Sequence, residues 1–191
     1  MKKLLLLVLP CFAVFMLASC ATEYEPAPQI LPAHIRTVFI RPVINNTNQF
    51  GLEAKFTNAI ADEIMRDGRL SIVNTEREAN GVLVVTIKKY ILQPLTYDIN
   101  MVPEQYKLWI IVSVSFVDVN NDVTLWTEPN MEGLQIYRDI TKQNSDVALG
   151  DGMSEEEARE VIWEKLSRDI VTRTVQGFGS VTSVSERKVP S

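Results

Sequence analysis

Few side chains in this sequence have the types and spacing that catalysis requires. His34 is the only histidine among 191 residues, and it lies in a proline-rich stretch. General acid–base catalysis, nucleophilic catalysis and metal binding each need a second suitable group beside such a histidine. The sequence places none near it, so we interpret His34 as a solvated linker residue.

Carboxylates gather in two places, over residues 62–67 and 155–160. The first group falls on the surface of a predicted helix. The second falls at the start of another helix, where the positive end of the helix dipole favours acidic side chains. Gly150-Asp151-Gly152 lacks the lysine and the strand-to-helix context of a phosphate loop, so we interpret it as a hinge. We therefore predict no catalytic residue, no metal site and no cofactor, and we expect that the protein is not an enzyme.

Cys20 has chemistry of a different kind. Two lysines precede an apolar run over residues 4–17, which is shorter than the roughly 20 residues that cross a bilayer core. The run ends in Leu17-Ala18-Ser19-Cys20, which resembles the bacterial lipobox. We predict a signal peptide over residues 1–19, cleavage before Cys20, and lipidation of Cys20. The alternative is an ordinary signal peptide that happens to contain a cysteine.

Cleavage before Cys20 would change the length and the net charge of the chain. Removing 19 of the 191 residues leaves 172 and takes away two lysines, so the formal charge moves from −5 to −7. Cys11 leaves with the signal peptide, and no thiol remains for a disulfide. By the usual sorting rule for lipoproteins, Ala21 after the cysteine implies the periplasmic face of the outer membrane. Basic residues are scattered on this acidic chain, which argues against nucleic-acid binding.

Hydrophobic patterning predicts one domain behind a tether. Residues 20–35 hold three prolines and form the predicted tether. Strands are predicted over 37–44, 70–73, 82–92, 106–119 and 123–137. Helices are predicted from Leu52 to Gly68 and from a capping box at Ser154 to near Gly177. The order predicts an α+β fold with both helices on one face of a mostly antiparallel sheet. The domain spans residues 36–178, and a disordered tail is predicted over 179–191.

The strand over 106–119 has two unlike faces. Alternate residues from Leu108 to Phe116 are apolar and form the predicted core face. Trp109 and Ile111 belong to the other face, and apolar residues on an open sheet face suggest a partner surface. Cover by the tether or by the C-terminal tail is the alternative.

Several short motifs occur in a specific order along the mature chain. They are Pro42-Val43-Ile44-Asn45-Asn46-Thr47, Gly51-Leu52-Glu53, Arg66-Asp67-Gly68-Arg69-Leu70, Tyr90-Ile91-Leu92-Gln93-Pro94-Leu95-Thr96-Tyr97-Asp98, Glu104-Gln105-Tyr106-Lys107-Leu108 and Leu125-Trp126. Together with the lipobox, they resemble the LptE family of outer-membrane lipoproteins. The resemblance implies two helices packed on one face of a four-stranded sheet, which matches the predicted order apart from the short strand over 70–73.

The resemblance also implies a function without catalysis. LptE proteins plug the LptD β-barrel, assist its assembly and bind lipopolysaccharide on its way to the cell surface. The expected partners are therefore an LptD-like barrel, lipopolysaccharide, and the membrane through acyl chains on Cys20. Family members contact lipopolysaccharide through basic residues in loops at one end of the sheet. The loop over 98–104 has no basic residue here, so the nearest candidates are Lys89, Lys107 and Lys142.

Other readings stay open. A solvated sheet face explains Lys88 and Lys89 without any ligand. LpoB-like or CsgG-like lipoproteins, which include regulators of peptidoglycan synthases, share the opening strand, the Asn-Thr turn and the helix behind a lipobox. The motifs at 90–98 and 104–108 favour the LptE family over them. A structural lipoprotein without a ligand is a third possibility.

Overall fold

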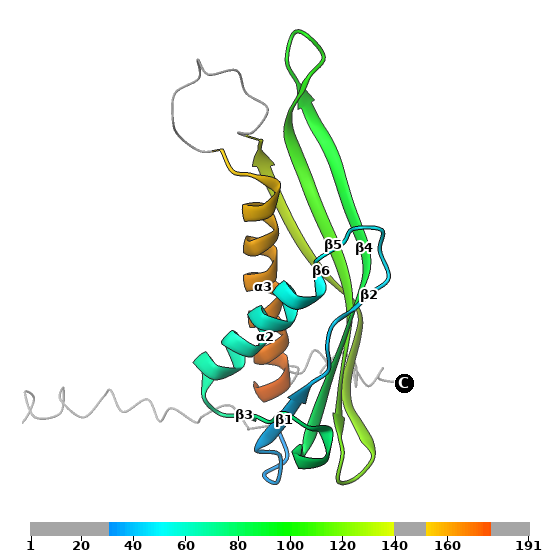
Figure 1. Cartoon of the computed structure of the whole chain (residues 1–191), viewed down its shortest axis with the longest axis vertical. Helices are drawn as coiled ribbons and strands as arrows, with labels where there is room; N and C mark the ends of the chain where they lie inside the picture. Colours follow the sequence, from blue (N-terminus) through cyan, green and yellow to red (C-terminus); the bar gives the residue numbers. More distant parts are fainter. Residues whose placement is uncertain (1–30, 140–151, 177–191) are drawn as a thin grey trace, which may run out of the picture.

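The computed structural model describes residues 31–139 and 152–176, which form a long sheet with two helices on one side of it (Figure 1). The strands are β1 (Thr37–Ile40), β2 (Ile44–Asn45), β3 (Ser71–Ile72), β4 (Gly81–Tyr97), β5 (Pro103–Asp118) and β6 (Val123–Arg138). The helices are α2 (Glu53–Asp67), α3 (Glu155–Gln176) and the short 3-10 helix η2 (Glu76–Glu78). Within the described ranges, no helix is long and apolar enough to cross a membrane. The predicted signal peptide, Cys20, Lys142 and the predicted tail lie outside these ranges.

The sheet has six strands of mixed direction. Five follow one another in the order β3-β1-β4-β5-β6, and β2 pairs with β4. The pairs β4–β5 and β5–β6 are antiparallel, whereas β1 is parallel to both β3 and β4, and β2 is parallel to β4. The predicted four-stranded, mostly antiparallel sheet was therefore wrong in its strand count and in the direction of its first strands. The reason is α2, because a helical crossover returns the chain to the same end of the sheet and makes neighbouring strands parallel.

Two prolines explain where the strand boundaries differ from the predicted ones. Pro42 follows β1, and the single strand predicted over 37–44 is two short strands with Pro42 between them. Proline has no amide hydrogen for a strand ladder. Pro94, by contrast, lies inside β4, beyond the last β2–β4 pair at Ile87. Proline is tolerated at such an edge position. The predicted end of this strand at Leu92 was therefore wrong.

The end of α2 and the start of α3 lie where the sequence predicts them, whereas the predicted end of α3 near Gly177 lies outside the described residues. α2 is followed by Gly68, which has a φ of 76° and donates its N–H to the carbonyl of Ile64 at 3.1 Å. At the start of α3, the Glu157 N–H donates to Ser154 Oγ at 3.2 Å, and the Ser154 N–H donates to the Glu157 carboxylate at 2.7 Å. The N–H and the hydroxyl of Ser154 both donate to the Glu157 carboxylate and hold the pKa of Glu157 below its usual value. The predicted capping box is confirmed.

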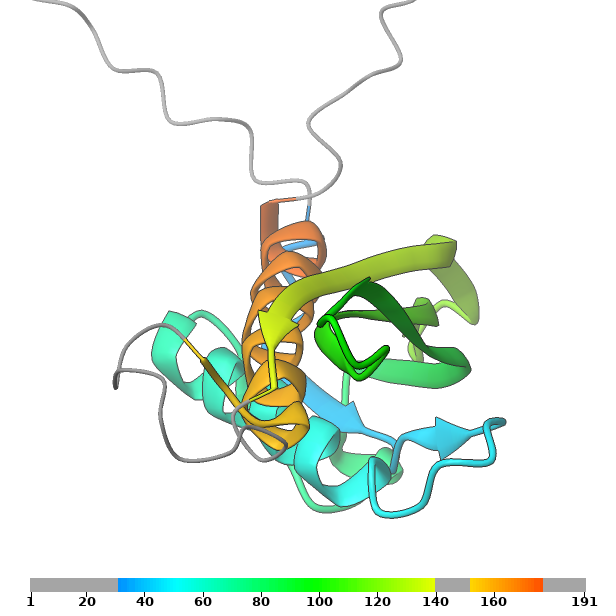
Figure 2. The same ribbon diagram turned by 90° about the horizontal axis from the view of Figure 1, so that it is seen from above.

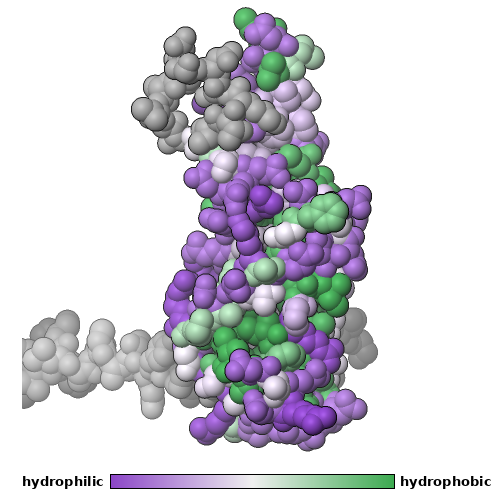
Figure 3. Space-filling model, in the orientation of Figure 1, coloured by the Kyte–Doolittle hydropathy of each residue, from purple (hydrophilic) through white to green (hydrophobic). Residues whose placement is uncertain are grey.

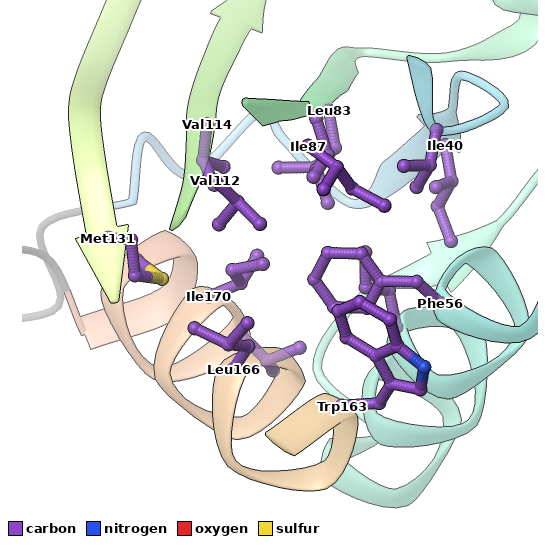
Figure 4. Close-up of a cluster of buried hydrophobic side chains, with 14 of the residues drawn as sticks. Ile40, Phe56, Leu83, Ile87, Val112, Val114, Met131, Trp163, Leu166 and Ile170 are labelled. Carbon is purple, nitrogen blue, oxygen red and sulfur yellow. The ribbon is translucent and has the colours of Figure 1, made fainter. Parts of the chain in front are cut away.

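The core lies between the two helices and one face of the sheet (Figures 2 and 4). The predicted core face of β5 is confirmed, because five alternate side chains are fully buried: Leu108, Ile110, Val112, Val114 and Phe116. The helices are joined by Phe56 of α2 and Trp163 of α3, whose stacked ring centroids are 4.4 Å apart. Burial of each such side chain stabilises the fold by about 1.5–3 kcal/mol.

Gly133 sets how closely α3 approaches β6. A Cβ atom at this position would collide with Cγ2 of Ile162 and would lie 3.0 Å from Cδ1 of Leu166. Both of these α3 side chains are fully buried. A residue without a side chain is therefore required for α3 to pack against the middle of β6.

The segment 31–35 packs against the domain, although the sequence places it in the tether. Leu31 and Ile35 are 8% and 3% exposed and belong to the core. Between them, His34 Nε2 lies 2.8 Å from the Asp118 carboxylate at the end of β5. The interpretation of His34 as a solvated linker residue missed this hydrogen bond. It joins the first described residues to the last residue of β5.

Asp118 has an unusual environment for a carboxylate, because its side chain is almost fully buried. Burial alone would raise its pKa. The hydrogen bonds from Asn121 Nδ2 (2.8 Å), His34 and the backbone N–H of Asn120 (3.0 Å) outweigh burial, so the pKa of Asp118 lies below its ordinary value. The ionised form is thus the one that the fold favours.

We expect Gly133→Ala to destabilise the protein by about 1–3 kcal/mol, because the added methyl group overpacks the contact between α3 and β6. Urea unfolding followed by circular dichroism measures this loss. Gln93→Ala, at an exposed position of β4, is the control and should change stability by less than about 0.5 kcal/mol. If the Gly133 variant were as stable as the native protein, the close contact between Gly133 and α3 would not be required for packing.

Asp118 predicts a dependence of stability on pH. Because the pKa of Asp118 is lowered on folding, its carboxylate stabilises the fold above the unfolded-state pKa of about 3.9, and this contribution is lost as pH falls below about 4. Asp118→Asn should therefore be less stable than the native protein at pH 7, with a difference that shrinks toward pH 3. Urea midpoints at the two pH values test this, and a difference that grows in acid would refute it.

Candidate functional site

The face of β4, β5 and β6 that points away from the helices, here called the open face, carries the residues that the sequence singled out. The strand register lines up side chains on it, with Ile91 opposite Trp109 and Trp109 opposite Leu134. One step further along β5, Lys107 lies opposite Ile136. In the other direction, Ile111 lies between Lys89 and Glu132. We call the five apolar members of this set the apolar strip: Ile91, Trp109, Ile111, Leu134 and Ile136.

The apolar strip is unevenly accessible. Leu134 and Ile136 are 43% and 49% exposed, whereas Ile111 is only 8% exposed. Trp109 is half-buried, and its indole N–H is buried without a hydrogen-bond partner among the described residues. The ammonium of Lys107 lies 5.6 Å from the centroid of the Trp109 ring, within the range of a cation–π contact. The strip thus offers apolar surface at Leu134 and Ile136, while the Trp109 N–H lies beneath it.

The structure brings four of the predicted site residues onto one face. Lys107, Trp109 and Ile111 lie on the open face, as the alternation of β5 predicts, and the pairing of Lys89 with Ile111 adds Lys89 of β4 to it. Lys89 is paired with Ile111, which lies four residues after Lys107 on β5. At the usual rise per residue, this separation along the strand is about 13 Å. The fifth predicted residue, Lys142, lies outside the described ranges.

Sequence reasoning missed the three other members of the strip. Leu134 and Ile136 alternate with helix-facing residues of β6, and this period of two was visible in the sequence. The bulge near Pro129 hid it, because an extra residue there reverses which residues face the core. Ile91 was hidden in the same way by the bulge between Ile87 and Lys89.

Lys89 borders a shallow groove of about 360 Å³ at the edge of the sheet. Its walls come from the loop after β2 and from β4: Asn46, Thr47, Asn48, Gln49, Lys88, Lys89, Tyr90 and Ile91. Lys88 is occupied elsewhere, since its ammonium donates to the Pro129 carbonyl at 3.2 Å and to Asn130 Oδ1 at 3.0 Å. Lys89 is exposed and has no ion pair among the residues described. It is the cation of this groove that an anion could reach.

Tyr90 joins β4 to the start of α3. Its hydroxyl donates to the Glu155 carboxylate at 2.5 Å. Burial and this hydrogen bond raise the pKa of Tyr90 well above its usual value. The phenol therefore stays protonated at neutral pH and acts as a structural donor.

The hairpin that joins β4 and β5 presents apolar side chains at one end of the molecule (Figure 3). Ile99 and Met101 are 99% and 76% exposed, and Tyr97 and Val102 beside them are about half exposed. Asp98 fixes the turn, because its Oδ1 accepts from the N–H groups of Asn100 and Val102, each at 2.8 Å. The exposed tip is thus held in a defined shape by hydrogen bonds.

A second groove, of about 400 Å³, lies between α2 and α3. It holds many of the carboxylates that the sequence drew attention to, but ion pairs neutralise several of them. Lys55 pairs with Glu156, Arg66 with Glu63, and Arg168 with Glu164. Among the described residues, no group of histidine, cysteine, aspartate and glutamate side chains could hold a metal ion. We find no arrangement in this groove that favours a particular reaction.

A family model described as "LptE: Lipopolysaccharide-assembly" matches residues 35–174, almost the whole of the described domain. The chain belongs to the LptE family. This is a family of membrane-associated, non-enzymatic lipoproteins that act in lipopolysaccharide transport together with an outer-membrane partner. The resemblance seen in the sequence motifs is thereby confirmed. No curated protein matches the chain.

Solved structures share the fold of this LptE-family chain at low sequence identity. A protein from Xanthomonas campestris is 5% identical with a TM-score of 0.52, covering 76% of this chain and 89% of its own. A hypothetical protein from Chlamydia trachomatis is 15% identical with a TM-score of 0.51, covering 75% and 97%. PelC from Paraburkholderia phytofirmans is 11% identical with a TM-score of 0.48, covering 79% and 96%. At these identities, the first two likenesses show the fold alone.

Proposed function

We propose that this LptE-family chain is a lipoprotein of the outer membrane that plugs an LptD-like β-barrel, assists its assembly and takes part in lipopolysaccharide transport. Acyl chains on Cys20 hold it at the periplasmic face. The family match carries the assembly role. The sequence motif at 17–20 supports lipidation, and Ala21 after the cysteine supports sorting to the outer membrane.

The open face is the observation that best supports a barrel partner. A sheet with helices on one side buries that side and leaves the other for solvent or for a partner. Here the exposed side carries the apolar strip, in which Leu134 and Ile136 are 43% and 49% exposed. A closely fitting inner wall of a barrel would cover these two side chains.

The position of the predicted lipid anchor relative to the hairpin tip supports the same proposal. The first described segment leads into β1 at one end of the molecule, and the hairpin tip between β4 and β5 lies at the opposite end of the long axis (Figure 1). The predicted lipid at Cys20 is eleven residues before Leu31, a span of at most about 40 Å. Anchored in this way, the chain would hold its base near the periplasmic leaflet and point Ile99 and Met101 away from its anchor.

Lys89, Lys107 and Lys142 remain our proposed contacts for lipopolysaccharide. Lys89 and Lys107 are on the open face, and Lys89 borders a polar groove. Phosphate groups of a lipid headgroup pair well with such ammonium groups. Trp109 beside Lys107 adds an apolar surface for the same ligand.

Purification of the tagged, lipidated chain from outer membranes tests the barrel proposal. We expect the native chain to recover a large β-barrel, and Ile91→Glu to recover several-fold less because a charge replaces part of the apolar strip. Val161→Glu, at a 42% exposed position of α3, is the matched control and should recover as much as the native chain. Recovery of a penicillin-binding protein in place of a barrel would support a regulator of peptidoglycan synthesis, and recovery of neither would support a structural lipoprotein.

Charge reversal tests the lipopolysaccharide contacts. We expect Lys89→Glu, Lys107→Glu and Lys142→Glu, combined in one chain, to weaken binding of purified lipopolysaccharide by about tenfold or more, equivalent to about 1.4 kcal/mol. The matched control reverses three basic residues on the helix side, Lys55, Arg66 and Arg168. Unchanged binding in the first variant would remove the three lysines from the proposal.

A further inference from the structure

A third groove, of about 400 Å³, lies where the described chain begins. It is lined by the segment 31–36, which ends in Arg36, and by Arg69 and Ser71 at the start of β3. β1 and β3 are at the end of the molecule opposite the hairpin tip (Figure 1). The groove shares no lining residue with the groove beside Lys89 or with the groove between the helices. It is therefore separate from every site described above.

The Arg69 guanidinium is held in a fixed position at this groove. Its Nε donates to Asp67 Oδ1 at 2.8 Å, and its Nη2 donates to Asp67 Oδ2 at 2.6 Å. The hydrogen bonds from Arg69 hold the pKa of Asp67 below its usual value, so the carboxylate stays ionised at neutral pH. Asp67 uses two of the five guanidinium N–H groups, which leaves three that can donate to a ligand.

Arg36 brings a second guanidinium to the same groove. Its side chain is exposed and forms no ion pair within residues 31–139 and 152–176. Its carbonyl accepts from the Ser71 N–H at 2.9 Å, which holds the Arg36 backbone beside β3. None of the described residues that line the groove is acidic, and Asp67 balances only one of the two guanidiniums. The groove therefore keeps positive charge.

The side chains of this groove are suited to a phosphate group that is attached to an apolar group. Arginine presents its N–H groups in a planar fork that matches the oxygens of a phosphate. The Ser71 hydroxyl, which forms no hydrogen bond among the described residues, adds a further donor. Pro32 and Ala33 line the groove as well and offer apolar surface beside these donors.

The position of the groove indicates a phospholipid as the source of this phosphate. The segment that lines the groove is the one that leads back to Cys20, which is eleven residues before Leu31 and at most about 40 Å away. With the predicted lipid on Cys20, this short tether keeps the groove within reach of the headgroups of the leaflet. Tethering raises the effective concentration of those headgroups at the groove above that of a free phosphate.

We propose that the groove between the segment 31–36 and β3 binds the headgroup phosphate of an anionic phospholipid. Arg36 and Arg69 pair with the phosphate oxygens, and the Ser71 hydroxyl donates a hydrogen bond to them. The bound headgroup gives the domain a second point of attachment to the membrane beside the lipid on Cys20. This site goes beyond the proposed function and rests only on its predicted lipidation of Cys20, not on a contact with a barrel or with lipopolysaccharide.

Native mass spectrometry of the full, lipidated chain in a non-ionic detergent tests the site. We expect the chain to retain one phosphatidylglycerol, and to retain several-fold less of a diacylglycerol with the same acyl chains, which lacks the phosphate. An equal concentration of inorganic phosphate should not displace the bound lipid. Equal retention of the diacylglycerol, or displacement by inorganic phosphate, would overturn the phospholipid headgroup as the ligand. The intact mass also shows whether Cys20 is acylated, so failure of the anchor is distinguished from failure of the site.

Three variants test the residues of the groove in the same measurement. We expect Arg36→Gln, which breaks no ion pair within the described residues, to lower the retained phosphatidylglycerol several-fold. Ser71→Glu keeps both arginines but adds a carboxylate to the groove, and it should also lower retention several-fold. Arg77→Gln removes the same charge at an exposed position of η2 outside the groove, and it should retain as much lipid as the native chain. Native retention in both groove variants, or an equal loss in the Arg77 control, would overturn the proposal.

Discussion

The packing of α3 against one face of β5 and β6 is the contact on which the rest of this structure depends. It requires Gly133, because any larger residue there would collide with Ile162 and press on Leu166. The stacked rings of Phe56 and Trp163 then join α2 to α3 and extend the cover toward β1. Both helices are thereby used on one side of the sheet (Figure 2). The other side is left to water or to a partner, and the apolar residues found there need an explanation that the fold itself does not supply.

The division of the sheet into a helix-covered face and an open face is consistent with a protein that works through contacts. Several of the carboxylates between the helices are held in ion pairs, and the strongly shifted phenol of Tyr90 is a structural donor to Glu155. The remaining notable features are surfaces, namely the apolar strip and the ordered hairpin tip. Membership of the LptE family fits such a molecule, because lipopolysaccharide assembly by a lipoprotein without catalysis depends on contacts with partners.

The sequence predicted what depends on local patterns. The alternation of Leu108 to Phe116 located the core face of β5, and the capping box at Ser154 located the start of α3. Ordered motifs indicated the family, although each was weak alone. These features are local because period, caps and motifs are read within a few residues.

What the sequence did not reveal depends on distant residues or on bulges. The parallel pairing of β1 follows from where the α2 crossover returns the chain, and the bond from His34 to Asp118 spans 84 residues. Leu134 and Ile136 escaped notice because the bulge near Pro129 reverses the two faces of β6. Alternation along β5 placed Lys107 on one face with Trp109, but only the register shows that Lys89 of β4 shares this face.

The central claim is that the open face, and not the helical side, meets the outer-membrane partner. Site-specific photo-crosslinking in intact cells tests it most directly, with a photoreactive residue placed at Ile91 on the open face or at Asn58 in the groove between the helices. The account predicts a crosslink from position 91 to a large outer-membrane β-barrel. A crosslink to that barrel from position 58 with none from position 91 would contradict it.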